Sequence, residues 1–131
     1  MAKHYSEKPI EKWNVNNFVT YMDDLHQELF GIPYAPMRSW SAERGLLGNA
    51  IGTTKKAGKH DKEVIKRFID ETFRNYTPTQ KYPGTSFMFM YTYRQQDLQR
   101  ITKDVQQRNL DEKKAEEITQ DQSSISDWLN S

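Results

Sequence analysis

The chain has 131 residues, of which 35% are hydrophobic, 12% aromatic and 28% charged, and its formal net charge is +1. This length suits one domain with a modest, aromatic-rich core. The sequence has no cysteine for disulfides or thiolate zinc sites, no stretch near the ~18 apolar residues of a membrane span, and no apolar leader typical of a signal peptide. It therefore predicts a soluble, cytoplasmic protein.

Two helices are predicted in the first half of the chain, after a lead-in over residues 1–13 that Trp13 anchors. The first helix begins at a cap formed by Asn14 or Asn16 and ends before Gly31, which favours a left-handed turn. Its apolar positions are Phe18, Tyr21, Met22, Leu25 and Leu29. The second helix starts near Ser41 and runs to residue 51. Its two glycines, at positions 45 and 48, predict a close approach of another backbone.

A third helix has the clearest amphipathic pattern in the chain. Asp61 is its predicted cap, and the sequence Thr77-Pro78 ends it. Its apolar face consists of Val64, Ile65, Phe68, Ile69, Phe73 and Tyr76. We expect this face to form a large part of the core.

The densest apolar stretch of the chain is the aromatic run from Phe87 to Tyr93. Taken alone, the run is also compatible with a buried strand, because it is short and apolar on both faces. An apolar stripe at helical spacing extends beyond it, through Phe87, Met90, Tyr91, Leu98, Ile101 and Val105. The stripe predicts one helix that is capped by Thr85 or Ser86 and continues past residue 101. So many large side chains indicate core rather than ligand stacking.

The overall prediction is an all-α fold: a small domain of about four helices with a charged, flexible or helical C-terminal extension. Residues 1–101 form the helical body, residues 102–121 form a charged linker, and residues 122–131 carry a C-terminal peptide motif. The linker is predicted to be helical or frayed, because charged pairs sustain a solvated helix while too little apolar surface exists for packing.

No catalytic or metal-binding pattern is present. His4, His26 and His60 are not spaced as a helical metal-binding pair. The neighbouring carboxylates Asp70 and Glu71 point to different sides of a helix, so they predict no acid/base pair. The expectation is a protein that is not an enzyme and needs no cofactor or metal.

Positive charge is concentrated in the middle of the chain. Residues 37–68 hold eight basic and three acidic residues, whereas residues 102–131 hold four basic and seven acidic residues. The basic residues are Arg38, Arg44, Lys55, Lys56, Lys59, Lys62, Lys66 and Arg67. They are candidates for contacting nucleic acid or an acidic protein surface; the favoured alternative is a solvated face with a flexible loop over residues 52–60. A nucleotide-binding loop is excluded, because Gly58-Lys59 is followed by His60 rather than Ser or Thr.

The C-terminal peptide matches a short recognition pattern. Gln122, Ile125, Trp128 and Leu129, with Asp127 between them, fit the pattern Gln-x-x-aliphatic-x-x-aromatic-(aromatic or Leu) of peptides that bind DNA sliding clamps. One helical turn would bring the three apolar residues to a single hydrophobic pocket. The alternative is that Trp128 and Leu129 fold back onto the body.

Four segments of the body resemble the RpbA-like family of small T-even-type phage proteins that bind the host RNA polymerase. They are Trp13–Phe18, Phe30–Tyr34, Phe68–Asp70 and Tyr82–Phe87, and the resemblance covers roughly residues 5–101. The ending Asp127-Trp128-Leu129 separately resembles the clamp-binding tails of T-even phage late transcription factors.

These resemblances imply a phage accessory protein in the cytoplasm of an infected bacterium. Its expected partners are bacterial RNA polymerase and, through the tail, the phage sliding clamp. The alternative hypothesis is a replication or DNA-binding accessory that contacts DNA through the basic middle region and the clamp through the same tail.

Overall fold

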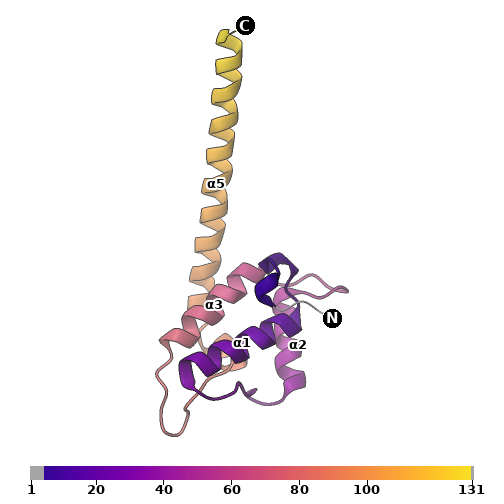
Figure 1. The fold of residues 1–131 in the computed structure, drawn as a ribbon, viewed down its shortest axis with the longest axis vertical. Helices are drawn as coiled ribbons and strands as arrows, with labels where there is room; N and C mark the ends of the chain where they lie inside the picture. The colour runs from indigo at the N-terminus through magenta and orange to yellow at the C-terminus, as the bar shows by residue number, and fades with distance from the viewer. Residues whose placement is uncertain (1–4, 131) are drawn as a thin grey trace. The chain divides into compact units, whose positions relative to one another are not determined.

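The computed structural model describes the backbone of residues 5–130 and the side chains of residues 5–116. The described residues form two 3-10 turns and five α-helices (Figure 1). They are η1 (Tyr5–Glu7), η2 (Ile10–Lys12), α1 (Val15–Phe30), α2 (Trp40–Ile51), α3 (Lys62–Asn75), α4 (Phe87–Tyr93) and α5 (Gln95–Asn130). This described part contains no β-strand, only an isolated bridge between Gly52 and Ala57. The all-α prediction is confirmed.

Contacts between Cα atoms divide the chain into two units, residues 1–101 and residues 102–131. Helix α5 crosses this boundary, and the predicted linker over residues 102–121 is helical. The predicted clamp-binding residues, from Gln122 to Leu129, lie in the helical backbone of α5. Their side chains are outside the described ones, as is residue 131.

Local hydrogen bonds set the ends of α1 as the sequence predicted. The side chain of Asn14 accepts from the backbone N–H of Asn17, and the side chain of Asn17 accepts from the backbone N–H of Asn14. This reciprocal capping box satisfies two donors that the helix leaves free. Gly31 ends the helix in the left-handed conformation, with φ of 73°. Of the two asparagines considered, Asn14 is therefore the cap.

The core of the first unit lies between α1, α2, α3 and α4, where α1 contacts α2 and α3, and α4 contacts the same two helices (Figure 1). Its buried side chains include Phe18, Met22, Leu25, Leu47, Val64, Ile65, Phe68, Ile69, Phe73, Phe87 and Met90. The predicted apolar face of α3 is confirmed except at Tyr76, which is half-buried beyond the end of that helix. Trp13 is buried as predicted, and its indole N–H donates to the carbonyl groups of Tyr5 and Lys8.

The predicted long aromatic helix is two helices, which is a correction. The chain leaves the helical conformation at Arg94, with φ of −120° and ψ of 37°, so α4 ends before it and α5 begins after it. The predicted apolar stripe is nevertheless buried at Leu98, Ile101 and Val105. Periodicity reports which positions are buried and carries no information on a change of helix axis. No Gly or Pro marks the break.

Helix α2 begins at Trp40, near Ser41 as predicted, and the hydroxyl of Ser39 caps it by accepting from the backbone N–H of Ala42 at 3.1 Å. Asp61 occupies the cap position of α3 but makes no capping hydrogen bond. A Cβ atom at Gly45 would meet nothing within 4 Å, and one at Gly48 would meet only side-chain methyls at 3.5 and 3.7 Å. The predicted backbone approach to α2 was therefore wrong.

Candidate functional site

The first unit has an open apolar groove of about 720 Å³ between the chain that follows α1 and the chain that precedes α4. Its lining residues are His26, Ile32, Pro33, Ala35, Met37, Tyr76, Thr77, Thr79, Lys81, Tyr82, Pro83, Gly84, Thr85, Ser86 and Phe89. Four of them are large hydrophobic residues with substantial exposure: Ile32, Met37, Tyr82 and Phe89. Tyr93 extends the apolar surface, because its ring lies 5.0 Å from that of Phe89. Exposed apolar clusters of this kind mark interaction sites.

The sequence places exposed side chains at this groove because both of its walls are irregular, proline-containing chain. Pro33 and Pro83 lie in these walls and favour extended backbone at the residues before them. The backbone of Tyr82 is nevertheless fixed: its N–H donates to Thr79 Oγ1 at 2.9 Å, and its carbonyl accepts from Tyr76 Oη at 2.7 Å. Its ring is 60% exposed. The backbone that carries this exposed ring is therefore preorganised.

His26 links the two walls of the groove through hydrogen bonds of its imidazole ring. The imidazole is buried, its Nδ1 lies 2.8 Å from the carbonyl oxygen of Ile32, and its Nε2 lies 3.2 Å from the backbone nitrogen of Thr85. Because the backbone N–H of Thr85 donates to Nε2, the proton resides on Nδ1, which donates to Ile32. The sequence spacing only excluded His26 from a helical metal-binding pair. Its position shows a structural link between segments that are far apart in the chain.

Glu43 and Tyr34 fix the start of α4 through hydrogen bonds to its backbone. The hydroxyl of Tyr34 donates to Glu43 Oε1 at 2.8 Å and accepts from the backbone N–H of Phe87 at 2.8 Å, while Glu43 Oε2 accepts from the N–H of Met88 at 3.1 Å. These groups satisfy N–H donors of the first turn of α4. Burial raises the pKa of the Glu43 carboxyl, although its hydrogen bonds oppose that effect. In the sequence, Glu43 was only one of the three acidic residues among residues 37–68.

Thr85 is another buried polar residue at the groove. It is 9% exposed, and its hydroxyl has no hydrogen-bond partner among the described residues. Leaving such a group unpaired costs roughly 1–3 kcal/mol. Thr85 is also the residue whose backbone N–H binds His26. Its hydroxyl is therefore a hydrogen-bonding group that the fold itself does not use.

A cluster of three lysines brings together segments that are distant in sequence. Lys62 Nζ, at the start of α3, donates to the carbonyl of Glu11 at 3.1 Å, and Lys8 Nζ donates to Asn17 Oδ1 at 2.9 Å. Burial, together with the positive charges of Lys8 and Lys12, lowers the pKa of Lys62. The sequence analysis did not select Lys8 or Lys12. Their relation to Lys62 depends on the packing of η2 on α3.

The predicted flexible loop over residues 52–60 is anchored at both ends. The backbone N–H groups of Lys59 and His60 donate to the carbonyls of Asn49 and Ala50, at 3.1 and 2.9 Å. Gly52 has φ of 91°, and a Cβ atom added to Gly58 would lie 2.4 Å from the nitrogen of Gly52. Close backbone contact at these two glycines explains their use here.

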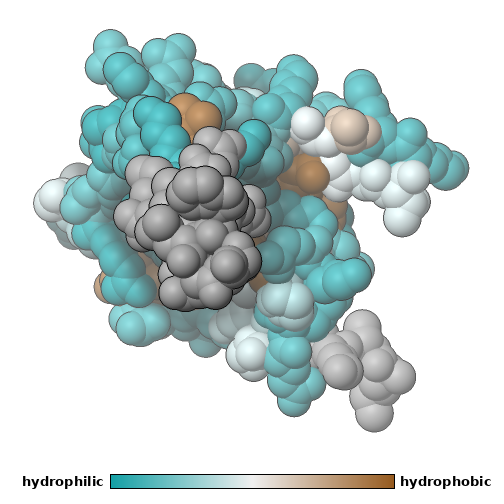
Figure 2. Space-filling view, turned by 90° about the horizontal axis from the view of Figure 1, so that it is seen from above, coloured by the Kyte–Doolittle hydropathy of each residue, from teal (hydrophilic) through white to brown (hydrophobic). Residues whose placement is uncertain are grey.

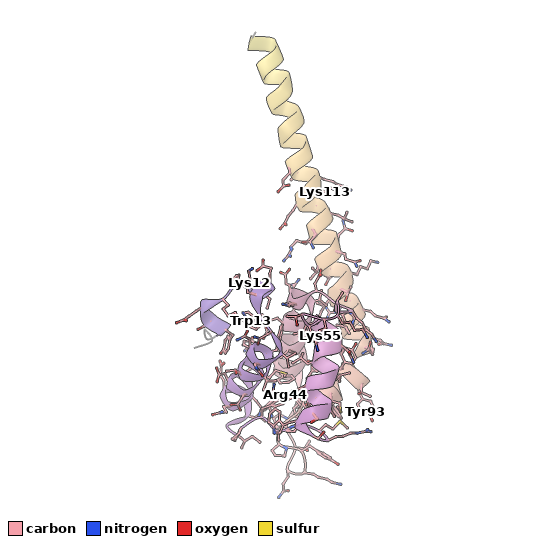
Figure 3. All side chains as sticks on the ribbon, turned by 90° about the vertical axis from the view of Figure 1, so that its right-hand side faces the viewer. Lys12, Trp13, Arg44, Lys55, Tyr93 and Lys113 are labelled. Carbon is pink, nitrogen blue, oxygen red and sulfur yellow. The ribbon has the colours of Figure 1, made fainter. Side chains whose placement is uncertain are left out.

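The remaining predicted basic residues do not form one surface with this loop. Lys66 forms an ion pair with Asp70 at 3.0 Å and lies over the ring of Tyr21, so it serves the fold. Arg44 hydrogen-bonds the side chain of Asn16. Lys55, Lys56 and Lys59 are exposed on the anchored loop, and Arg38 and Arg67 are exposed elsewhere. Lys12 and Lys55 lie toward one end of the body, and Arg44 and Tyr93 toward the other (Figure 3).

A second, polar cavity of about 460 Å³ lies beside the lysine cluster. Its lining residues are Ile10, Glu11, Ile51, Gly58, His60, Asp61, Lys62 and Glu63. Burial lowers the pKa of His60, as does the charge of Lys59 to a smaller extent. In the described part of the chain, no group of three or more histidine, aspartate or glutamate residues is placed to hold a metal ion. Within the same part, no helix has the length and apolar character to cross a membrane.

Comparison of the chain with protein-family models, with curated proteins and with solved structures finds no match. One face is predominantly hydrophilic (Figure 2), as expected for a chain with 28% charged residues. Against that background the apolar groove and the lysine cluster are the two candidate sites.

Proposed function

We propose that the protein is a phage-encoded accessory that binds the RNA polymerase of the host bacterium and modulates transcription. The observation that carries the proposal is the preorganised apolar groove, with the exposed side chains of Ile32, Met37, Tyr82 and Phe89. The sequence resemblance of residues 5–101 to RNA polymerase-binding phage proteins supports the same partner.

The chemistry of the groove favours a protein partner over nucleic acid. Protein interfaces have apolar centres that are enriched in aromatic residues and methionine. Interfaces with DNA are more polar and strongly positive. The groove has one lysine, Lys81, among its lining residues and two large exposed aromatic side chains, Tyr82 and Phe89.

The test is affinity capture of host polymerase by the tagged full chain from nuclease-treated bacterial lysate at moderate salt, with the subunits identified. Tyr82→Ala combined with Phe89→Ala is expected to weaken capture of polymerase at least tenfold, because both rings lose contact area at the centre of the interface. The thermal unfolding temperature should change little, since these side chains are 60% and 38% exposed.

The matched control is Leu110→Ala, which removes an exposed large apolar side chain outside the groove. This variant should capture polymerase as the wild type does. Undiminished capture by the double groove variant would show that polymerase binds elsewhere. If the wild-type chain captures no polymerase subunits, the proposed function is wrong.

We propose in addition that residues 122–131 bind the phage sliding clamp. The carrying observation is the sequence pattern, whose positions 125, 128 and 129 fall at helical spacing in α5. The 20 residues of the linker are helical and so measure roughly 30 Å, which makes them a semi-rigid spacer rather than a flexible tether.

Replacing Ile125, Trp128 and Leu129 by alanine is expected to abolish clamp binding, measured with purified clamp by calorimetry. Polymerase capture and thermal unfolding of the body should stay unchanged. Asn130→Ala, at a position outside the pattern, is the control. A large drop in unfolding temperature would instead support the fold-back of the tail.

A second candidate function, DNA binding by a replication accessory, is favoured by the lysine cluster. Lys8, Lys12 and Lys62 converge on one surface beside the anchored loop with its three lysines. This function predicts binding to a DNA duplex that weakens steeply with salt. Lys8→Ala with Lys12→Ala should then reduce the slope of log K against log salt by about two. Salt-independent or absent binding would contradict it.

A further inference from the structure

The described side chains that line the apolar groove include a lysine but no carboxylate to balance its charge. Lys81 is the one residue with a formal charge among the described lining residues when His26 is neutral, and no carboxylate lines the groove. Among the described residues Lys81 forms no ion pair, and its Nζ lies 5.5 Å from the centre of the Tyr82 ring. An ammonium has three N–H donors and no acceptor. The groove therefore presents an unmatched positive charge above its most exposed aromatic ring.

Two other polar residues at the groove are not available to a partner. Thr85 lines the groove, but its hydroxyl oxygen, unpaired among the described residues, is buried from solvent. The neighbouring histidine has no capacity left, because both ring nitrogens of His26 bind the backbone. The charge of Lys81 therefore sets the preference of the groove, and an ammonium favours a hydrogen-bond acceptor, above all an anionic one.

We propose that the groove binds a linear segment of the polymerase in which an aspartate or glutamate stands beside large apolar side chains. The carboxylate pairs with Lys81, and the apolar side chains pack on Tyr82, Met37 and Phe89. This inference rests on the proposed function and specifies the chemistry of the partner. A volume of about 720 Å³ is within the range of sites that bind a small number of side chains.

Charge reversal at Lys81 tests the inference. Lys81→Glu is expected to weaken capture of purified RNA polymerase at least tenfold, because a carboxylate would then face a carboxylate. Lys81→Met keeps much of the apolar stem and should weaken capture about threefold, the size of an exposed ion pair. The dependence of affinity on salt should be smaller for Lys81→Met than for the wild type. Lys103→Glu makes the same change of charge at an exposed position of α5 and should capture polymerase normally.

The outcomes separate the inference from the proposed function. Suppose that the double variant at Tyr82 and Phe89 no longer captures polymerase while Lys81→Glu still does. The proposal of an acidic bound segment is then wrong, and the proposal that polymerase docks in the groove is retained. If the wild-type chain captures no polymerase, both are overturned. If the wild type forms a dimer in solution that Lys81→Glu disrupts, the occupant is a second copy of the chain. Equal losses with Lys81→Glu and Lys103→Glu would indicate a general effect of net charge and would overturn the pairing.

Discussion

Replacement of Phe68 by alanine is expected to lower the free energy of unfolding by about 3–5 kcal/mol. Phe68 is fully buried in α3, and its ring meets that of Phe87 edge to face, with centroids 6.3 Å apart. Truncation therefore removes contact between α3 and α4 and leaves a cavity that the surrounding helices close only in part. Urea unfolding followed by circular dichroism measures the change.

The control for Phe68 is Phe89→Ala, the same truncation at a side chain that is 38% exposed. Its cost should be small by comparison, because water already reaches the ring. Similar costs at both positions would mean that the α3 face does not form the core. The two variants also separate stability from binding, since Phe89→Ala alters the groove.

Replacement of Gly84 by alanine is the second large effect, with an expected cost of about 3 kcal/mol. A Cβ atom at this position would lie 2.3 Å from Nε2 and 2.5 Å from Cε1 of His26, inside the contact distance of any pair of atoms. The imidazole cannot move aside without losing its hydrogen bonds to Ile32 and Thr85. The cost combines overpacking with the loss of buried hydrogen bonds.

Gly45→Ala is the matched control for Gly84→Ala. Its new methyl group would meet nothing within 4 Å in the middle of α2, and alanine is the better helix former. The control should raise the free energy of unfolding by about 0.5–1 kcal/mol. Gly84→Ala should also weaken polymerase capture, because it separates the walls of the groove. An unchanged unfolding free energy for Gly84→Ala would show that His26 does not hold the walls together.

The sequence predicted the helices well because their apolar spacing is regular. The face of α3, the cap at Asn14 and the turn at Gly31 each depend on neighbours within a few residues. The break at Arg94 was missed, since it involves no helix-breaking residue and changes direction without changing which positions are buried. Local pattern specifies elements better than their junctions.

The candidate site was less predictable, because it is made by contacts between distant segments. Tyr82 was named only as the first residue of a segment that carries the family resemblance, and the exposure of its ring depends on how residues 76–86 pass over His26. An isolated glutamate such as Glu43 is expected at the surface. It is buried here because the hydroxyl of Tyr34 donates a hydrogen bond to its carboxylate. Lys8 and Lys12 carry no pattern of their own. The sequence feature that pointed to this site was Pro-Gly at residues 83–84, which marks a turn.

The attachment of α4 through Tyr34 and Glu43 has a consequence for the order of assembly. Its first N–H groups bind side chains 53 and 45 residues earlier in the chain. A helix of seven residues is too short to persist alone in water. Residues 87–93 therefore acquire their structure only once the loop after α1 and the start of α2 are in place. As the chain leaves the ribosome, the groove is completed only after α4 has emerged, so nascent chains that end before α4 do not display the docking surface.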